Sequence, residues 1–241
     1  MPAAAGGKIV DGMKDIAFVL YPGLTILDMV GPLQVLSMLP LFDPEYRTVV
    51  LGEDTAPVST DTPLGVAASH TFDEVPAPYA MFLPGGGVPT MAALADEKLL
   101  GHVREMAETA EIVGSVCTGS LILGAAGLLD GRRATTHWMC RHLLPKFGAT
   151  PVAERWVRDG KLLTAAGVAA GIDMALFLVQ ELAGADIARQ VQLAIEYDPQ
   201  PPLGGIEWDG VDIDARRPLV DGWLKAGLAD HPKLLVELIG S

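Results

Sequence analysis

The chain has 241 residues, of which half are hydrophobic, and its formal net charge is -13 at pH 7. This length and composition suffice for one large globular domain with a substantial core. The negative charge argues against phosphate-backbone binding, because the 17 lysines and arginines are scattered rather than clustered, so we expect no nucleic-acid partner.

The N-terminal residues, the length of the apolar segments and the two cysteines argue against several classes of protein. Residues 1–14 lack the basic start and continuous apolar stretch of a secretory signal, and they predict a flexible leader. No segment approaches the ~20 apolar residues of a membrane span. The two cysteines, Cys117 and Cys140, predict no disulfide framework, and no Cys/His spacing resembles a zinc site. We therefore expect a cytoplasmic protein that needs no membrane, metal ion or other cofactor.

From residue 15 to about residue 195, strand-like apolar runs alternate with helix-like runs, which is typical of a parallel sheet with helices on both faces. An antiparallel excursion is expected at residues 57–69, turning at 61–63. A threonine is expected to cap the helix at 137–146. The expected strands are 15–21, 46–52, 79–83, 111–117, 156–158 and 162–165, and the expected helices are 25–39, 96–109, 119–126, 137–146, 168–182 and 187–195.

The composition changes sharply at residues 198–205, where proline and glycine are frequent. We therefore expect one α/β domain over residues 15–202, followed by a C-terminal extension over residues 203–241. The amphipathic stretches near 211–227 and 232–239 are each too short to fold alone. The extension must pack as helices on the core or on the partner in a dimer.

Cys117 falls on the turn between the strand at 111–117 and the helix at 119–126. Gly119 and Ser120 let the backbone bend there, as in a nucleophile elbow, and the following helix N-terminus favours the thiolate. The alternative is a small core side chain, because a lone cysteine in an apolar strand is most often that. The residues alone leave both interpretations open.

Three further candidates follow strands, where ligands bind in such sheets. Asp28 lies in the first turn of a helix among apolar neighbours, which would raise its pKa and keep it protonated as a proton donor; alternatively, it stabilises the helix N-terminus. Gly86 and Gly87 follow a strand and could offer backbone N–H groups to the substrate or an oxyanion. Thr118 places a hydroxyl beside the cysteine, or is a simple turn residue.

Histidines are poorly placed for a Cys-His-acid triad, because Thr118 follows the cysteine and no histidine follows the late strand at 162–165. His137 is the nearest candidate base, although at the start of a helix beside Trp138 it is more often a packing residue. Cys140 is expected to be a core thiol. Amide hydrolysis is therefore poorly supported.

Several segments resemble the DJ-1/PfpI superfamily, which has a flavodoxin-like α/β fold: residues 20–32, the Leu-Pro-Gly-Gly turn at 83–86, and Val-Cys-Thr-Gly-Ser at 116–120. Within it, Ser-Val-Cys-Thr-Gly-Ser and Arg-Ala-Thr-Thr-His-Trp are similar to the isonitrile hydratases. The resemblance covers residues 15–202. Ligand-sensing domains of some transcription regulators share the Asp-x-x-Gly-Pro and Thr-Thr-His-Trp segments.

The resemblance implies a nucleophilic Cys117, an acidic Asp28, and Thr118 where proteolytic and deglycase-like relatives usually have histidine. It further implies a cofactor-independent homodimer that adds water to a small neutral isonitrile, giving an N-substituted formamide through a cysteine thioimidate. The alternatives are another thiol activity of the superfamily, such as a glyoxalase-like one, or a non-enzymatic redox or ligand sensor.

Overall fold

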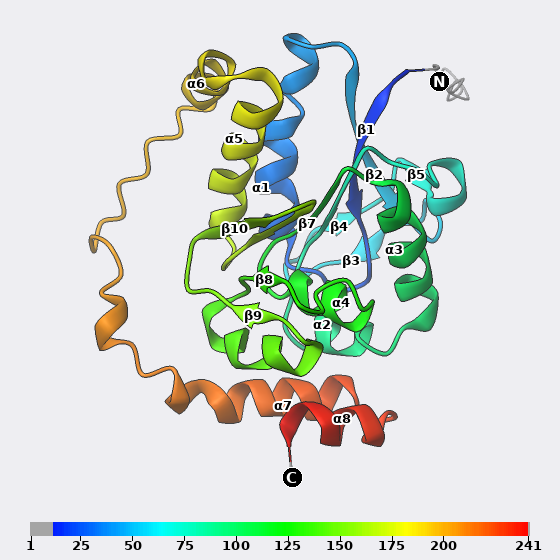
Figure 1. Cartoon of the computed structure of the whole chain (residues 1–241), viewed down its shortest axis with the longest axis vertical. Coiled ribbons are helices and arrows are strands. Elements are labelled where there is room, and N and C mark those ends of the chain that lie inside the picture. Colours follow the sequence, from blue (N-terminus) through cyan, green and yellow to red (C-terminus); the bar gives the residue numbers. More distant parts are fainter. Residues whose placement is uncertain (1–11, 241) are drawn as a thin grey trace.

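The computed structural model describes residues 12–240 and contains a seven-stranded sheet in the order β10-β11-β7-β6-β1-β2-β5 (Figure 1). Neighbouring strands pair in parallel, except for the antiparallel pair β10 and β11. The predicted mixed α/β fold is confirmed. The strands are β1 Lys14–Val19, β2 Tyr46–Gly52, β5 His70–Thr71, β6 Ala80–Leu83, β7 Ile112–Ser115, β10 Trp156–Asp159 and β11 Leu162–Ala165.

The central strands β6 and β7 are buried along their whole length, which explains their continuous apolar sequences. Phe18 of β1 stacks on Phe82 of β6 with ring centroids 5.5 Å apart. Gly114 of β7 makes room for this pair, because a Cβ atom there would lie 2.2 Å from the Phe82 ring. Of the predicted leader, residues 1–11 lie outside the described residues, and Lys14 already belongs to β1.

The helices cover both faces of the sheet. α1 (Ile26–Leu36) packs against α5 (Ala170–Ala183) on one face, and α3 (Glu97–Thr109) and α4 (Gly119–Ala125) lie on the other (Figure 1). α6 (Ala185–Ala194) packs on α5. The Asp96 side chain caps α3 by accepting the N–H groups of Lys98 and Leu99.

Two predictions for local structure need correction. The short α2 (Val88–Ala93) was not expected, and residues 138–147 form a 3-10 helix, η3 (Trp138–Phe147), that contains Pro145. The predicted threonine cap of this helix is wrong. The Thr135 hydroxyl donates to the Glu154 carbonyl and the Thr136 hydroxyl to the Cys117 carbonyl, so His137 precedes the helix without a side-chain cap.

The excursion after β2 forms the expected antiparallel pair, β3 (Val58–Ser59) with β4 (Gly65–Val66). It braces the loop before α1, because the Gly23 N–H donates to the Ser59 carbonyl. The Asp61 carboxylate accepts the Ile26 N–H at 2.9 Å, at the start of α1. The remaining short elements are η1 Leu39–Leu41, η2 Phe72–Glu74, β8 Arg133–Ala134 and β9 Thr150–Pro151.

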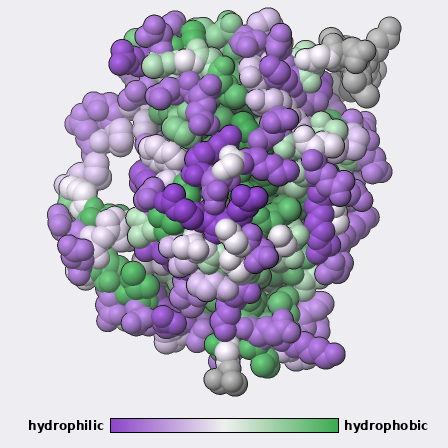
Figure 2. All heavy atoms as spheres, viewed as in Figure 1, coloured by the Kyte–Doolittle hydropathy of each residue, from purple (hydrophilic) through white to green (hydrophobic). Residues whose placement is uncertain are grey.

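The C-terminal extension runs across the end of the molecule toward which β1 points (Figure 1). Residues 198–210 are exposed, and the space-filling view shows an opening between this segment and the rest of the protein (Figure 2). The extension then returns and packs α7 against α2, where a Cβ on Gly227 would lie 2.7 Å from the Ala92 nitrogen. Its elements are η4 Trp208–Gly210, η5 Asp214–Arg216, α7 Arg217–Gly227 and α8 Pro232–Ile239.

Within residues 12–240, the helices are all too short or too polar to cross a membrane.

Candidate active site

Cys117 occupies a sharp turn between β7 and α4. Its φ is +57°, a left-handed conformation that costs a residue with a side chain of order 1–3 kcal/mol. Two hydrogen bonds hold the turn: the Cys117 N–H donates to the Ala166 carbonyl, and the Cys117 carbonyl accepts the Thr136 hydroxyl, both at 2.9 Å. Gly119 has to be glycine, because a Cβ there would lie 2.2 Å from the Leu83 oxygen. This is the backbone geometry of a nucleophile elbow.

The Cys117 thiol is only 6% exposed, and its pKa is raised well above the usual value. Burial is the main cause and the nearby Asp28 carboxylate adds to it, while the backbone N–H groups of Thr118 and Val168 oppose both. The Thr118 N–H before α4 thus favours the thiolate, but burial and the Asp28 carboxylate act more strongly in the opposite direction. Desolvation outweighs the two N–H groups.

Asp28 lies in the first turn of α1, where the loop before the helix is tied to the loop after β6. The Thr25 N–H donates to the Gly85 carbonyl at 2.8 Å, and the Gly85 N–H donates to Asp28 Oδ2 at 2.9 Å. The residue is 1% exposed, and the other carboxyl oxygen, Oδ1, is buried without a hydrogen-bond partner. A proton on Oδ1 would therefore leave the hydrogen bond from Gly85 to Oδ2 intact.

Burial raises the pKa of Asp28 to about 7, although the Gly85 N–H and the Cys117 side chain lower it. Each of the two side chains thus changes the pKa of the other, so they titrate as a coupled pair. Because the pKa of Asp28 is about 7 and that of Cys117 lies well above its usual value, the pair holds one proton above pH 7 and two below it. It can therefore supply both a sulfur nucleophile and a proton at one place.

In the glycine loop after β6, the N–H groups of Gly85 and Gly86 make structural hydrogen bonds. The Gly86 N–H donates to Thr118 Oγ1 at 2.9 Å, and the Thr118 hydroxyl donates to the Gly86 carbonyl at 2.7 Å. The Gly86 N–H therefore already has an acceptor within the protein. Gly87 is the N-cap residue before α2, and its Cβ position lies 3.7 Å from the Trp223 ring of α7. Binding of a substrate or an oxyanion by Gly86 and Gly87 stays a prediction.

Sequence reasoning missed the roles of three residues at this site. A Cβ on Gly85 would lie 2.5 Å from the Thr118 nitrogen and 3.0 Å from Asp28 Oδ2, so only glycine brings the loop to the acid. Val168 acts through its N–H, and Thr136 through a hydrogen bond to the backbone of the elbow. In the sequence, the Gly-Gly turn after β6 and the Ala-Gly turn after β11 were the features that could have indicated backbone groups at the site.

His137 packs beside the site. Its Cδ2 lies 2.9 Å from the Cβ position of Gly167, and burial lowers its pKa. Its Nδ1 is buried without a hydrogen-bond partner. Cys140 is fully buried in the core, as predicted. In the described part of the chain, no three His, Cys, Asp or Glu side chains group together to hold a metal ion.

The fold and this geometry define a class: a doubly wound α/β protein with a cysteine on a strand-to-helix turn and a buried carboxyl beside it. The chain belongs to the DJ-1/PfpI family, whose model matches residues 14–181.

Comparison with known proteins places the chain near both enzymes and regulators of this family. It is 47% identical over 189 residues to isonitrile hydratase of Pseudomonas putida, covering 78% of this chain and 80% of that protein. It is 31% identical to the HTH-type transcriptional regulator CdhR of Pseudomonas aeruginosa, covering 74% of this chain and 53% of the regulator. The crystal structure of a THiJ/PfpI family protein from Pseudomonas syringae matches with a TM-score of 0.79 and 35% identity, covering 100% of this chain and 98% of that one.

Proposed function

We propose that the protein is an isonitrile hydratase, which converts an isonitrile and water into an N-substituted formamide. The observation that carries this proposal is the buried Asp28 carboxyl, with a pKa of about 7, beside the Cys117 thiol. The terminal carbon of an isonitrile accepts both a nucleophile and a proton. A single thiol-carboxyl pair meets that demand without a histidine.

The first step adds the proton and the sulfur of the pair to the isonitrile carbon. A C–S and a C–H bond form, the C≡N triple bond becomes a C=N double bond, and the product is a thioimidate on Cys117 with Asp28 left as a carboxylate. The Asp28 carboxylate then accepts a proton from water while the water oxygen attacks the thioimidate carbon. That proton passes to the nitrogen.

The last step breaks the C–S bond. The hydroxyl of the tetrahedral intermediate becomes the formamide carbonyl, its proton returns to the pair, and sulfur leaves with the bonding electrons. The overall reaction consumes one isonitrile and one water and restores the single proton shared by Cys117 and Asp28. The N–H groups of Thr118 and Val168 stabilise negative charge on the sulfur as it leaves.

Similarity to both an enzyme and regulators supports a small-molecule ligand at this site, and the 47% identity supports hydration of isonitriles. Another thiol activity, such as glyoxalase-like conversion, and a non-enzymatic sensor are the alternatives. The homodimer and the cytoplasmic location remain predictions. Exposed Leu27 and Val30 on α1, 43% and 38% accessible, support an interface on that helix.

The test is incubation with cyclohexyl isocyanide and chromatographic detection of N-cyclohexylformamide. We expect product from the wild type and from Cys140→Ala, which removes the other thiol, and none from Cys117→Ala. Absence of product from the wild type, or equal product from Cys117→Ala, would overturn the proposal. Turnover of methylglyoxal instead would support the glyoxalase-like alternative, and reversible oxidation without either activity would support a sensor.

A further inference from the structure

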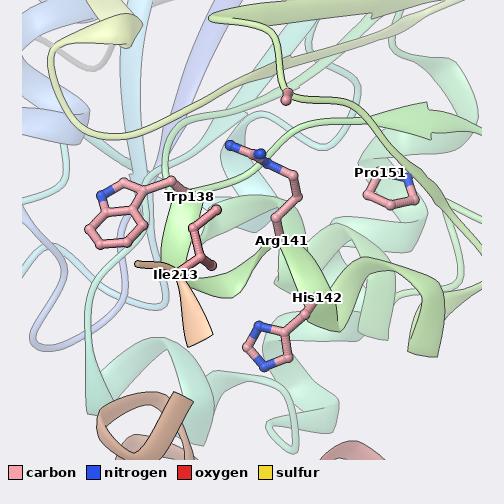
Figure 3. A pocket seen from close by; sticks show the side chains of 6 residues that line it. Trp138, Arg141, His142, Pro151 and Ile213 are labelled. Atoms are coloured by element: carbon pink, nitrogen blue, oxygen red, sulfur yellow. The ribbon is translucent and has the colours of Figure 1, made fainter. Parts of the chain in front are cut away.

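A pocket of about 370 Å³ lies between η3 and the C-terminal extension (Figure 3). The Arg141 guanidinium lies between Trp138 and Pro151 in the close view, whereas the His142 ring points to the other side. Its volume is in the range of small-molecule sites. The pocket is lined by Trp138, Arg141, His142, Pro151, Ala153 and Ile213.

Arg141 is a partly buried cation without an anion. In residues 12–240, every other arginine either has an ion pair or is exposed, although the whole chain carries a net charge of -13. Its Nε is buried and makes no hydrogen bond. Burial lowers the pKa of Arg141, and no carboxylate offsets that effect. A partly buried guanidinium lowers the stability of the protein unless an anion compensates its charge. The planar N–H groups of a guanidinium match the two oxygens of a carboxylate.

The side chain of His137 links the surroundings of Cys117 to the wall of the pocket. The His137 ring packs on Gly167, next to Val168, whose N–H interacts with the Cys117 sulfur. On its other side, the His137 ring lies 5.7 Å from the Trp138 ring, and after burial the charge of Arg141 is the second cause that lowers the pKa of His137. His137 thus contacts both the backbone beside the sulfur and the wall of the pocket.

The outer wall comes from the C-terminal extension. Ile213 lines the pocket, and Trp208 meets Trp138 edge to face with ring centroids 6.1 Å apart. The lining is thus apolar and aromatic apart from the Arg141 guanidinium and the His142 ring. This combination suits an organic anion better than inorganic phosphate, because the apolar groups would lie against the body of the ligand.

We propose that Arg141, Trp138 and Ile213 form a subsite for a carboxylate, so that the substrate is an isonitrile with a carboxylate at the far end of an apolar body. This inference rests on the proposed function. It replaces the expectation of a neutral substrate and gives the C-terminal extension a role in recognition.

The test compares hydration of trans-4-isocyanocyclohexanecarboxylate with that of its methyl ester. We expect Arg141→Gln to lower kcat/KM for the carboxylate about 10- to 100-fold, the range for a hydrogen bond to a charged group. The same variant should leave the ester within about 2-fold of the wild type, which also shows that it folds. Arg216→Gln, which removes an exposed arginine of the extension, should change neither substrate.

A binding measurement separates this inference from the proposed function. Calorimetry with cyclohexanecarboxylate, which has no isonitrile, should show binding to Cys117→Ser and its loss in Cys117→Ser with Arg141→Gln. If the ester is hydrated but Arg141→Gln changes kcat/KM equally for the carboxylate and the ester, the subsite proposal is wrong and the hydratase proposal stands. If no isonitrile is hydrated, the hydratase proposal fails, and binding of the carboxylate through Arg141 then decides the subsite alone.

Discussion

Replacing Asp28 with asparagine should stabilise the protein at alkaline pH while abolishing isonitrile hydration. The side chains have the same shape, and the amide oxygen can accept the Gly85 N–H that Oδ2 accepts now. What the variant removes is a buried carboxyl that must ionise in a nearly dry site. The Asp28 carboxyl is thus predicted to lower the stability of the protein although the reaction requires it.

The magnitude follows from the pKa of Asp28, which rises from 3.8 to about 7 on folding. Between these values the folded protein holds a proton that the unfolded chain has released, so the free energy of unfolding falls as pH rises through this window. One pKa unit corresponds to about 1.36 kcal/mol, so the full cost is at most about 4 kcal/mol above pH 7. At pH 5 it is about 1.6 kcal/mol by the same relation.

Urea unfolding at pH 5 and pH 8, at one fixed protein concentration, measures this effect. We expect the advantage of Asp28→Asn over the wild type to grow by about 2–3 kcal/mol from pH 5 to pH 8. Asp230→Asn, a change at an exposed aspartate, should show no such growth. An equal difference between Asp28→Asn and wild type at both pH values would refute a carboxyl that ionises near pH 7, and with it the proposed proton source.

Two further predictions concern the pair and the extension. For isonitrile hydration, kcat/KM should rise as the pH increases through about 7. Below this pH both Asp28 and Cys117 are protonated, so the pair holds one proton too many for the reaction. A pH-rate profile that falls through pH 7 would contradict this prediction. Gly227→Val should destabilise the docking of α7 on α2 by about 1–3 kcal/mol. Hydrogen exchange in α7 should then accelerate, whereas Gly222→Ala, which points into open space in the same helix, should leave it unchanged.

The sheet could be predicted from the sequence because its central strands are short apolar runs bounded by turn residues. β2 and β11 begin and end where the pattern places them. α2 was missed because six residues that begin Val-Pro carry less than two turns of helical periodicity. η3 was predicted as an ordinary helix because a 3-10 helix and an α-helix share similar apolar spacing over ten residues.

The site was harder to predict, because much of it consists of backbone groups. Small residues on both sides of Cys117 indicated a sharp turn. Local sequence does not show, however, that the thiol is buried with Asp28 of α1 nearby, because Asp28 is distant in sequence. The N–H groups of Gly85 and Val168 belong to residues without a polar side chain. Their positions follow from tertiary structure, which local sequence does not encode.

Burial is the property that links stability, protonation and chemistry at this site. A more open site would return Asp28 toward its usual pKa and remove the stability cost. The single proton of the pair would then rest more firmly on the thiol, and less of the pair would hold a thiolate beside a protonated carboxyl. A drier site would raise the pKa of both Asp28 and Cys117 further. Both side chains would then stay protonated, and no thiolate would form. The Gly85 N–H on Asp28 and the Val168 N–H near the sulfur set the balance between these extremes, because each stabilises negative charge on one member of the pair.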